Sequence, residues 1–163
     1  MSSLTDSVPM TLDHTVSRLI ETISSLQDAM NHCIYESLGP TTGIVDKWTA
    51  LNLHTWSSEK AVLKYAMEIL PLLLFFKNRL PKMKAEFISL TILYENTETD
   101  EASKPFETLY LDTIKELNSI FSLTGVRFKE FKNRLRLIIF KINSLVEFTN
   151  QFLLRLLYDI ASQ

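Results

Sequence analysis

The amino-acid sequence predicts an all-α fold, an antiparallel helical bundle of about five helices, two of them long. Glycine accounts for only 3 of the 163 residues, whereas sheet proteins need glycine at turns and bulges. Apolar residues recur in steps of three and four along most of the chain, which is the spacing of an amphipathic helix. Residues 87–94 favour strand formation, but no second strand is present to pair with them.

The first long helix is expected over residues 12–38, after a disordered lead over residues 1–10. Residues 11–163 then form a single domain. Thr11 or Asp13 can cap the first turn, and Gly39-Pro40 ends the helix. Its apolar residues follow a heptad spacing: Leu12, Val16, Leu19, Ile23, Leu26, Met30 and Cys33.

The middle of the chain predicts two shorter helices that follow an irregular segment. Residues 39–57 form that segment, with a short helix around residues 46–53. A helix from Ser57 or Ser58 to Leu80 is apolar all round near its centre, where Pro71 should kink or split it. Pro81 should then separate it from a helix over residues 82–94.

The second half of the chain predicts a loop and two more helices. Residues 95–104 carry four acids and one lysine, so we expect an exposed, mobile loop. Pro105 suits the first turn of the next helix, which Thr124-Gly125 ends. The longest helix is expected over residues 126–161, with a seam of nine residues: Phe128, Phe131, Leu135, Ile138, Ile142, Leu145, Thr149, Phe152 and Leu156.

The apolar face of the last helix is broad enough to contact two neighbours. A second row, Ile139, Val146, Leu153 and Ile160, repeats every seven residues beside the seam. Helices 12–38 and 126–161 are long enough to lie side by side, with the shorter helices covering them. We also expect part of their apolar surface to be buried between chains, either by self-association through these two helices or in a complex with another protein.

Charge and cysteine content restrict the classes of function. The net charge of −2 means that nucleic acid or membrane binding would need a local basic patch. Residues 1–11 lack the parts of a signal peptide, and no uncharged stretch is long enough to suggest a transmembrane segment. Cys33 is the only cysteine, and no Asn-x-Ser/Thr site occurs, which predicts an intracellular protein, cytoplasmic or nuclear.

The sequence carries none of the motifs of an enzyme, so neither catalysis nor a cofactor is expected. It lacks glycine-rich phosphate loops, and it has neither HExxH nor GxSxG. Asp28, His32 and Cys33 could be drawn as metal ligands, but a di-metal bundle needs Glu-x-x-His pairs, which are absent. Cys33 also lies on the apolar seam, where it is better interpreted as a small core residue.

A basic strip on the last helix is the first candidate binding surface. Six basic residues and one acid, Glu130, occur between residues 127 and 141. The six are Arg127, Lys129, Lys132, Arg134, Arg136 and Lys141. They could dock an acidic protein, a phosphate or an anionic lipid, or they could form a solvated face neutralised by acids such as Asp112 and Glu116. Nucleic acid is less expected because no aromatic residue interleaves with the charges on the polar side.

Trp48 and Trp56 form the second candidate surface. They could cover one end of the bundle, or they could anchor a partner helix or peptide. From these observations we expect a non-catalytic protein–protein interaction module, either a helical adaptor or a subunit of a larger complex. The alternative function is an anionic-surface binder, of membrane phosphates or nucleic acid, that uses the basic strip.

Overall fold

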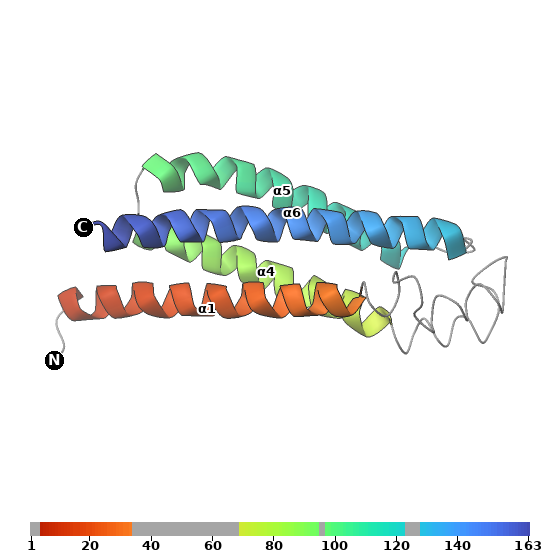
Figure 1. Ribbon diagram of the computed structural model, residues 1–163, viewed down its shortest axis with the longest axis horizontal. Coiled ribbons are helices and arrows are strands. Elements are labelled where there is room, and N and C mark those ends of the chain that lie inside the picture. Colours follow the sequence, from red (N-terminus) through yellow and green to blue (C-terminus); the bar gives the residue numbers. More distant parts are fainter. Residues whose placement is uncertain (1–3, 34–68, 95–96, 123–127) are drawn as a thin grey trace.

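The computed structural model describes residues 4–33, 69–94, 97–122 and 128–163, and only the backbone for residues 4–11, 97–98 and 128–129. These residues form four helices and no strand: α1 (Leu4–Cys33), α4 (Leu70–Leu93), α5 (Thr97–Phe121) and α6 (Phe128–Ala161). Successive helices run in alternating directions, so the two chain termini lie at the same end of the bundle (Figure 1). The predicted all-α fold is therefore confirmed.

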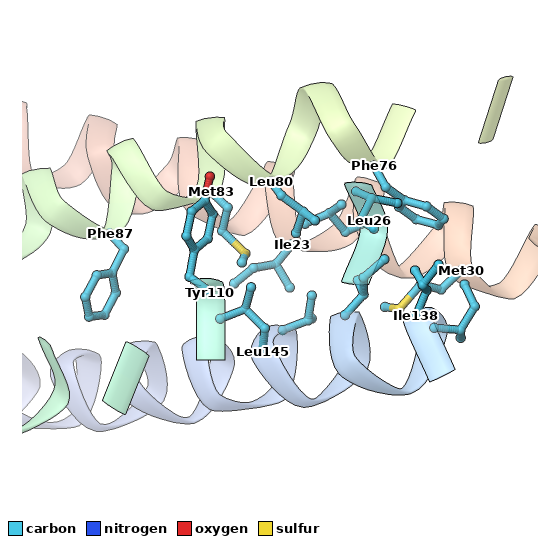
Figure 2. Close-up of a cluster of buried hydrophobic side chains, with 14 of the residues drawn as sticks. Ile23, Leu26, Met30, Phe76, Leu80, Met83, Phe87, Tyr110, Ile138 and Leu145 are labelled. Carbon is cyan, nitrogen blue, oxygen red and sulfur yellow. The ribbon is translucent and has the colours of Figure 1, made fainter. Parts of the chain in front are cut away.

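The four helices form a closed ring around one core. Helix α1 packs against α4 and α6, and α5 packs against the same two helices from the opposite side. Figure 2 shows side chains from all four helices converging on the bundle axis, among them Leu26, Leu80, Tyr110 and Leu145. The two long helices lie side by side, as their lengths suggested, and the described seams of α1 and α6 are buried between Val16 and Cys33 and between Phe131 and Leu156.

Helix α1 begins at Leu4, whereas the prediction placed a disordered lead over residues 1–10. The spacing of Leu4, Val8, Leu12 and Val16 explains the earlier start, because these residues continue the helical period towards the N-terminus. Once a helix has nucleated, each added residue gains one hydrogen bond. The predicted end at Gly39-Pro40 and the short helix near residues 46–53 lie outside the described residues.

Helix α4 runs through Pro81 without a break, so the prediction of two helices separated at this proline was wrong. Pro71 stands in the first turn, where a proline fits because its missing N–H has no partner to lose. Pro81 lies on the exposed face, while the opposite face carries a continuous buried seam: Leu73, Phe76, Leu80, Met83, Phe87 and Leu90. Packing of this seam offsets the lost hydrogen bond, and about five predicted helices become four in the described parts of the chain.

Helix α5 begins at Thr97, so most of the predicted loop over residues 95–104 is helical, and Pro105 lies inside the helix. Asp100 and Glu101 stand near the start of α5, where acidic side chains interact favourably with the helix dipole. Thr99 is buried and Ala102 packs against the core, so these turns belong to the bundle. The acidic composition indicated a helix N-terminus rather than a loop.

Candidate interaction surface

The predicted site residues are only partly covered by the described structure. Trp48, Trp56 and Arg127 lie outside the described residues, and the side chain of Lys129 is also not described. The structure therefore tests neither the tryptophan segment nor the first turn of the basic strip. Four members of the strip remain, and they point to two different sides of α6.

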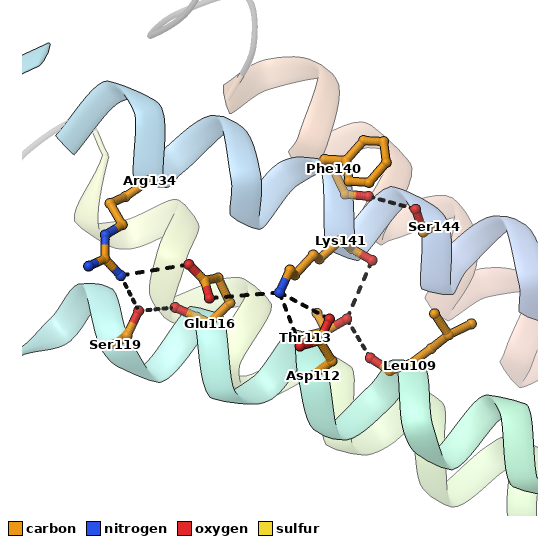
Figure 3. Close-up of polar contacts among 9 residues, drawn as sticks. All are labelled: Leu109, Asp112, Thr113, Glu116, Ser119, Arg134, Phe140, Lys141 and Ser144. Atoms are coloured by element: carbon orange, nitrogen blue, oxygen red, sulfur yellow. Dashed lines mark hydrogen bonds and ion pairs between the residues drawn. The ribbon is translucent and has the colours of Figure 1, made fainter. Parts of the chain in front are cut away.

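Arg134 and Lys141 face α5 and form ion pairs with its acids (Figure 3). The Lys141 Nζ atom lies 3.0 Å from Asp112 Oδ2 and 3.8 Å from Glu116 Oε2, and the Arg134 Nη1 atom lies 3.7 Å from Glu116 Oε1. Asp112 and Glu116 are the acids that the sequence offered as neutralising partners. The interpretation of these two cations as part of a solvated, neutralised face is supported at this interface.

The same contact between α5 and α6 includes hydrogen bonds to uncharged acceptors. The Thr113 hydroxyl is within bonding distance of two carbonyl oxygens, at 2.7 Å from Leu109 O and 3.4 Å from Lys141 O. Arg134 Nη1 donates to Ser119 Oγ at 3.4 Å. Arg134 and Lys141 on this side of α6 are thus engaged with groups of α5 and are not the unpaired cations that a docking surface would offer.

Lys132 and Arg136 lie on the other side of α6. Arg136 is exposed and Lys132 is half-buried, and neither forms an ion pair with a described residue. The strip is therefore divided by the fold, because residues seven apart share a side whereas residues two apart do not. Of the strip members whose side chains the structure describes, only this pair remains available to an anionic partner.

An apolar row on the outward face of α6 was not predicted. Leu137, Phe140, Leu154 and Tyr158 are 41 %, 67 %, 54 % and 73 % exposed. They stand in helical steps on the side opposite the buried seam, and Ser144, Glu147 and Gln151 fill the steps between them. We call these seven residues the outer α6 row. Large apolar side chains gathered on one exposed face mark interaction sites more often than scattered ones do.

Phe140 shows how the outer α6 row is presented. Its ring lies on the side of α6 away from Asp112 and Glu116, while Lys141 reaches towards them (Figure 3). The Ser144 hydroxyl donates to the Phe140 carbonyl oxygen at 3.0 Å, so this hydroxyl is bonded within its own helix. The row therefore combines the exposed Phe140 ring with a neighbouring serine whose hydroxyl already has a hydrogen-bond partner in α6. A sequence signal existed in the steps from 137 to 158, but the stronger inward seam concealed it.

Helix α6 also meets a length and hydropathy criterion for crossing a membrane. The stretch Glu130–Ala161 has a mean hydropathy of 1.2 in its most apolar window, of which 44 % is buried inside the bundle. Core helices of soluble proteins pass the same criterion, so it is weak evidence. The sequence expectation considered uncharged stretches only, and the criterion admits α6 because it tolerates the charges of Lys141 and Glu147.

A buried carboxylate lies in a groove of about 410 Å³ between α1 and α4. Glu86 is 8 % exposed, and neither of its carboxylate oxygens has a hydrogen-bond partner in the described parts of the chain. Arg18 and Lys82 line the same groove, with Thr15, Ala85 and Ser89. Across this interface the Thr22 hydroxyl is also buried without a described partner. Unpaired buried polar groups cost stability, so this interface differs from that of α5 and α6.

A third polar cluster joins α4 and α5. Lys84 Nζ lies 3.3 Å from Glu107 Oε1 and 4.7 Å from the centre of the Tyr110 ring. Burial of Tyr110 raises the pKa of its hydroxyl, and the negative charge of Glu107 raises that pKa further. Both effects disfavour the phenolate, so Tyr110 acts here as a neutral core residue with a polar edge.

The residues considered as metal ligands do not converge. Cys33 is fully buried, whereas Asp28 and His32 are exposed. No group of three or more His, Cys, Asp or Glu side chains that could hold a metal occurs within the described ranges. The interpretation of Cys33 as a core residue agrees with its burial.

Comparison with known proteins adds no relative. The chain matches no protein-family model, and searches of curated proteins and of solved structures find no significant match either. The outer α6 row and the divided basic strip are therefore the features from which a function has to be inferred.

Proposed function

We propose that this chain is a non-catalytic protein–protein interaction module that binds its partner through the outer α6 row. The observation that carries this proposal is the exposure of Phe140 and Tyr158 by about two thirds or more on one helix face. Aromatic side chains are enriched among the residues that dominate binding energy at protein interfaces. Their burial against a partner would remove apolar surface that the bundle itself leaves in water.

The construction of α6 supports the proposal. Its inward face is occupied by the core and its α5 side by ion pairs, so the outward face is not needed to hold the bundle together. A helix presented on a packed bundle is also a preorganised surface, which lowers the entropic cost of binding. The outer α6 row can therefore contribute to binding without disturbing the fold.

A photo-crosslinking residue in place of Phe140 tests the proposal directly. We expect a crosslink to a protein partner from position 140 and none from position 20 on α1, because Ile20 is an exposed apolar residue outside the row. Tyr158→Glu should abolish the crosslink, since it places a charge on the same face 18 positions further along. Equal crosslinking from positions 20 and 140 would refute the proposed surface.

Lys132 and Arg136 support a second candidate function, binding to an anionic surface. They are the described basic-strip side chains that no described acid neutralises. Vesicles containing phosphatidylserine provide the test. Binding that falls steeply between low and physiological salt, and that Lys132→Glu with Arg136→Glu removes, would favour this function. Binding that is indifferent to both changes would exclude it.

A further inference from the structure

We infer that the partner of this chain inserts one apolar side chain into a groove between α5 and α6, and that a basic and an acidic residue of the partner flank that side chain. The inference rests on the proposed function and deepens it, because it names the chemistry of the bound segment. The groove has a volume of about 190 Å³, and we call it the α5–α6 groove. Six residues line it: Glu101, Ala102, Pro105, Phe148, Phe152 and Arg155.

The floor of the α5–α6 groove is apolar and is held in place by the core. Phe152 is 5 % exposed, and its ring centre lies 5.0 Å from that of Phe87. Phe87 in turn stacks on Phe106 at 3.9 Å. Phe148 and Ala102 are partly buried against the same core. An apolar side chain that entered the groove would therefore meet a preformed surface, which lowers the entropic cost of binding.

The two rims of the α5–α6 groove carry opposite charges. Glu101 on α5 and Arg155 on α6 are both exposed, and neither forms an ion pair within the described parts of the chain. The charges of Lys141 and Asp112, by contrast, meet directly across the same pair of helices. A segment that places a basic residue at Glu101 and an acidic residue at Arg155 would complement both rims.

Pro105 adds a hydrogen-bond acceptor to the rim on α5. Proline has no amide hydrogen, so the carbonyl oxygen of Glu101 lacks its usual donor four residues further along the helix. Glu101 thus offers this carbonyl oxygen as well as its carboxylate. A Lys ammonium or an Arg guanidinium carries several N–H donors and no acceptor. The rim on α5 therefore favours a cationic side chain of the partner.

The size of the α5–α6 groove favours a side chain over a free small molecule. Pockets that enclose a whole drug-sized ligand have volumes of roughly 300–1,000 Å³. The α5–α6 groove, at about 190 Å³, has room for one side chain, and most of a larger free ligand would lie outside it. Protein interfaces concentrate their binding energy on a few such anchor residues.

The α5–α6 groove lies next to one end of the outer α6 row. Arg155 follows Leu154 directly and stands three residues, or about one helical turn, before Tyr158. Phe140 lies about 22 Å from Arg155 at a rise of 1.5 Å per residue. A partner helix of about fifteen residues can therefore be anchored in the groove and still reach Phe140. The groove and the row then form one continuous binding surface.

Selection from a phage-displayed library of random peptides, about 16 residues long, on the full chain tests the chemistry of the bound segment. We expect the selected peptides to share one large apolar residue with a base on one side and an acid on the other. Fluorescence anisotropy with one synthetic selected peptide should show that Arg155→Glu weakens binding about tenfold, because repulsion replaces attraction. Lys115→Glu is the control, since this exposed cation of α5 lies outside the groove.

A charge swap separates a direct contact from a loss of folding. A second peptide, in which a lysine replaces the acidic residue, should bind the Arg155→Glu variant about as tightly as the first peptide binds the parent. Glu101→Lys should respond in the same way to a peptide whose basic residue is replaced by a glutamate. A library that yields no binder, selected peptides without this pattern, or a charge swap without rescue would overturn the inference.

The two proposals fail in different ways. Selected peptides that lose binding with Phe140→Glu but not with Arg155→Glu would remove the α5–α6 groove and leave the outer α6 row as the binding surface. The same conclusion would follow from a library without binders if position 140 still crosslinks to a protein partner. A library without binders, together with equal crosslinking from positions 140 and 20, would remove both proposals.

Discussion

The interfaces between α5 and α6 and between α1 and α4 are built from similar apolar seams but treat their polar residues differently. At the first, Lys141 and Arg134 meet Asp112 and Glu116 at the rim of the core. At the second, the Glu86 carboxylate is buried without a described partner, although Arg18 and Lys82 line the same groove. Proximity of opposite charges is therefore not sufficient, because the carboxylate also has to reach them.

The difference shows that the seams set the stability of the fold and the polar groups modify it. Buried Leu residues occur on both sides, with Leu26 on α1 and Leu117 on α5. An ion pair at the rim of the core adds little to the free energy of unfolding. A buried group that loses its hydration without gaining a partner lowers that free energy by its full desolvation cost. Four measurements test this difference between the two interfaces.

The largest effect is expected from shortening the apolar seams. Leu26→Ala and Leu117→Ala should each lower the free energy of unfolding by about 2–5 kcal/mol, because each removes fully buried atoms and leaves a cavity. Urea titration followed by circular dichroism measures the change. Leu111→Ala is the control, since its exposed side chain should be worth less than about 0.5 kcal/mol. A small effect at only one of the two seams would contradict their equivalence.

The second effect concerns the buried carboxylate. Glu86→Leu should raise the free energy of unfolding by about 1–3 kcal/mol, because it removes a buried carboxyl group that has no described partner and extends the seam. Thermal unfolding and urea titration both measure it. Glu107→Leu serves as the matched control. Glu107 is paired with Lys84, so this variant should be slightly less stable than the parent. If Glu86→Leu destabilises the protein, the carboxylate has a partner and the two interfaces are alike.

The third effect is the coupling between Lys141 and Glu116. A double-mutant cycle with Lys141→Ala and Glu116→Ala should give a coupling of about 0.5–1 kcal/mol, which falls as salt is added. Arg136→Ala combined with Glu116→Ala should be additive, because these residues form no ion pair. A cycle that is additive for Lys141 as well would mean that the Lys141–Glu116 pair in Figure 3 contributes nothing.

The smallest effect is expected at the interface between α4 and α5, where Tyr110 should make the stability of the fold depend on pH. The raised pKa of Tyr110 means that the unfolded chain loses this proton at lower pH than the folded one. The contribution of Tyr110 to stability is therefore complete below its ordinary pKa of 10.0 and is lost as pH rises from there through the folded pKa. Tyr110→Phe should flatten this loss in unfolding curves measured between pH 9 and pH 11.5. An unchanged slope would contradict the raised pKa.

The sequence predicts elements that repeat over many turns and fails where one residue is interpreted alone. The heptad spacing of α6 was sufficient to place its helix and its buried seam, and Asp112 and Glu116 were anticipated as partners. Pro81 was predicted to separate two helices because a proline disrupts the interior of a helix. The helical spacing of apolar residues, however, continues on both sides of it. Packing decides such cases, because a seam in contact with three neighbours offsets one missing hydrogen bond.

The candidate site was harder to predict than the fold. Whether an apolar residue faces the core depends on which neighbours cover it, and Leu137 and Phe140 are as apolar as Ile138 and Ile139 beside them. The burial of Glu86 likewise depends on how α1 crosses α4. Sequence periodicity locates the strongest apolar face of a helix, and a second face on the same helix becomes visible only when the neighbours are in place.

Two exposed prolines inside helices, Pro81 in α4 and Pro105 in α5, have a consequence for local opening of the backbone. Pro81 and Pro105 have no amide hydrogen, so the carbonyl oxygens of Lys77 and Glu101 lack their usual helical donors. Each proline therefore leaves a gap in the row of backbone hydrogen bonds. These hydrogen bonds are what slow the exchange of amide protons for solvent deuterium. Amide protons near residues 78–82 and 102–106 should therefore exchange through small fluctuations, while those beside Leu90 and Leu117 wait for larger ones. A single helix of this bundle is thus expected to contain both segments whose amide protons exchange fast and segments whose amide protons exchange slowly.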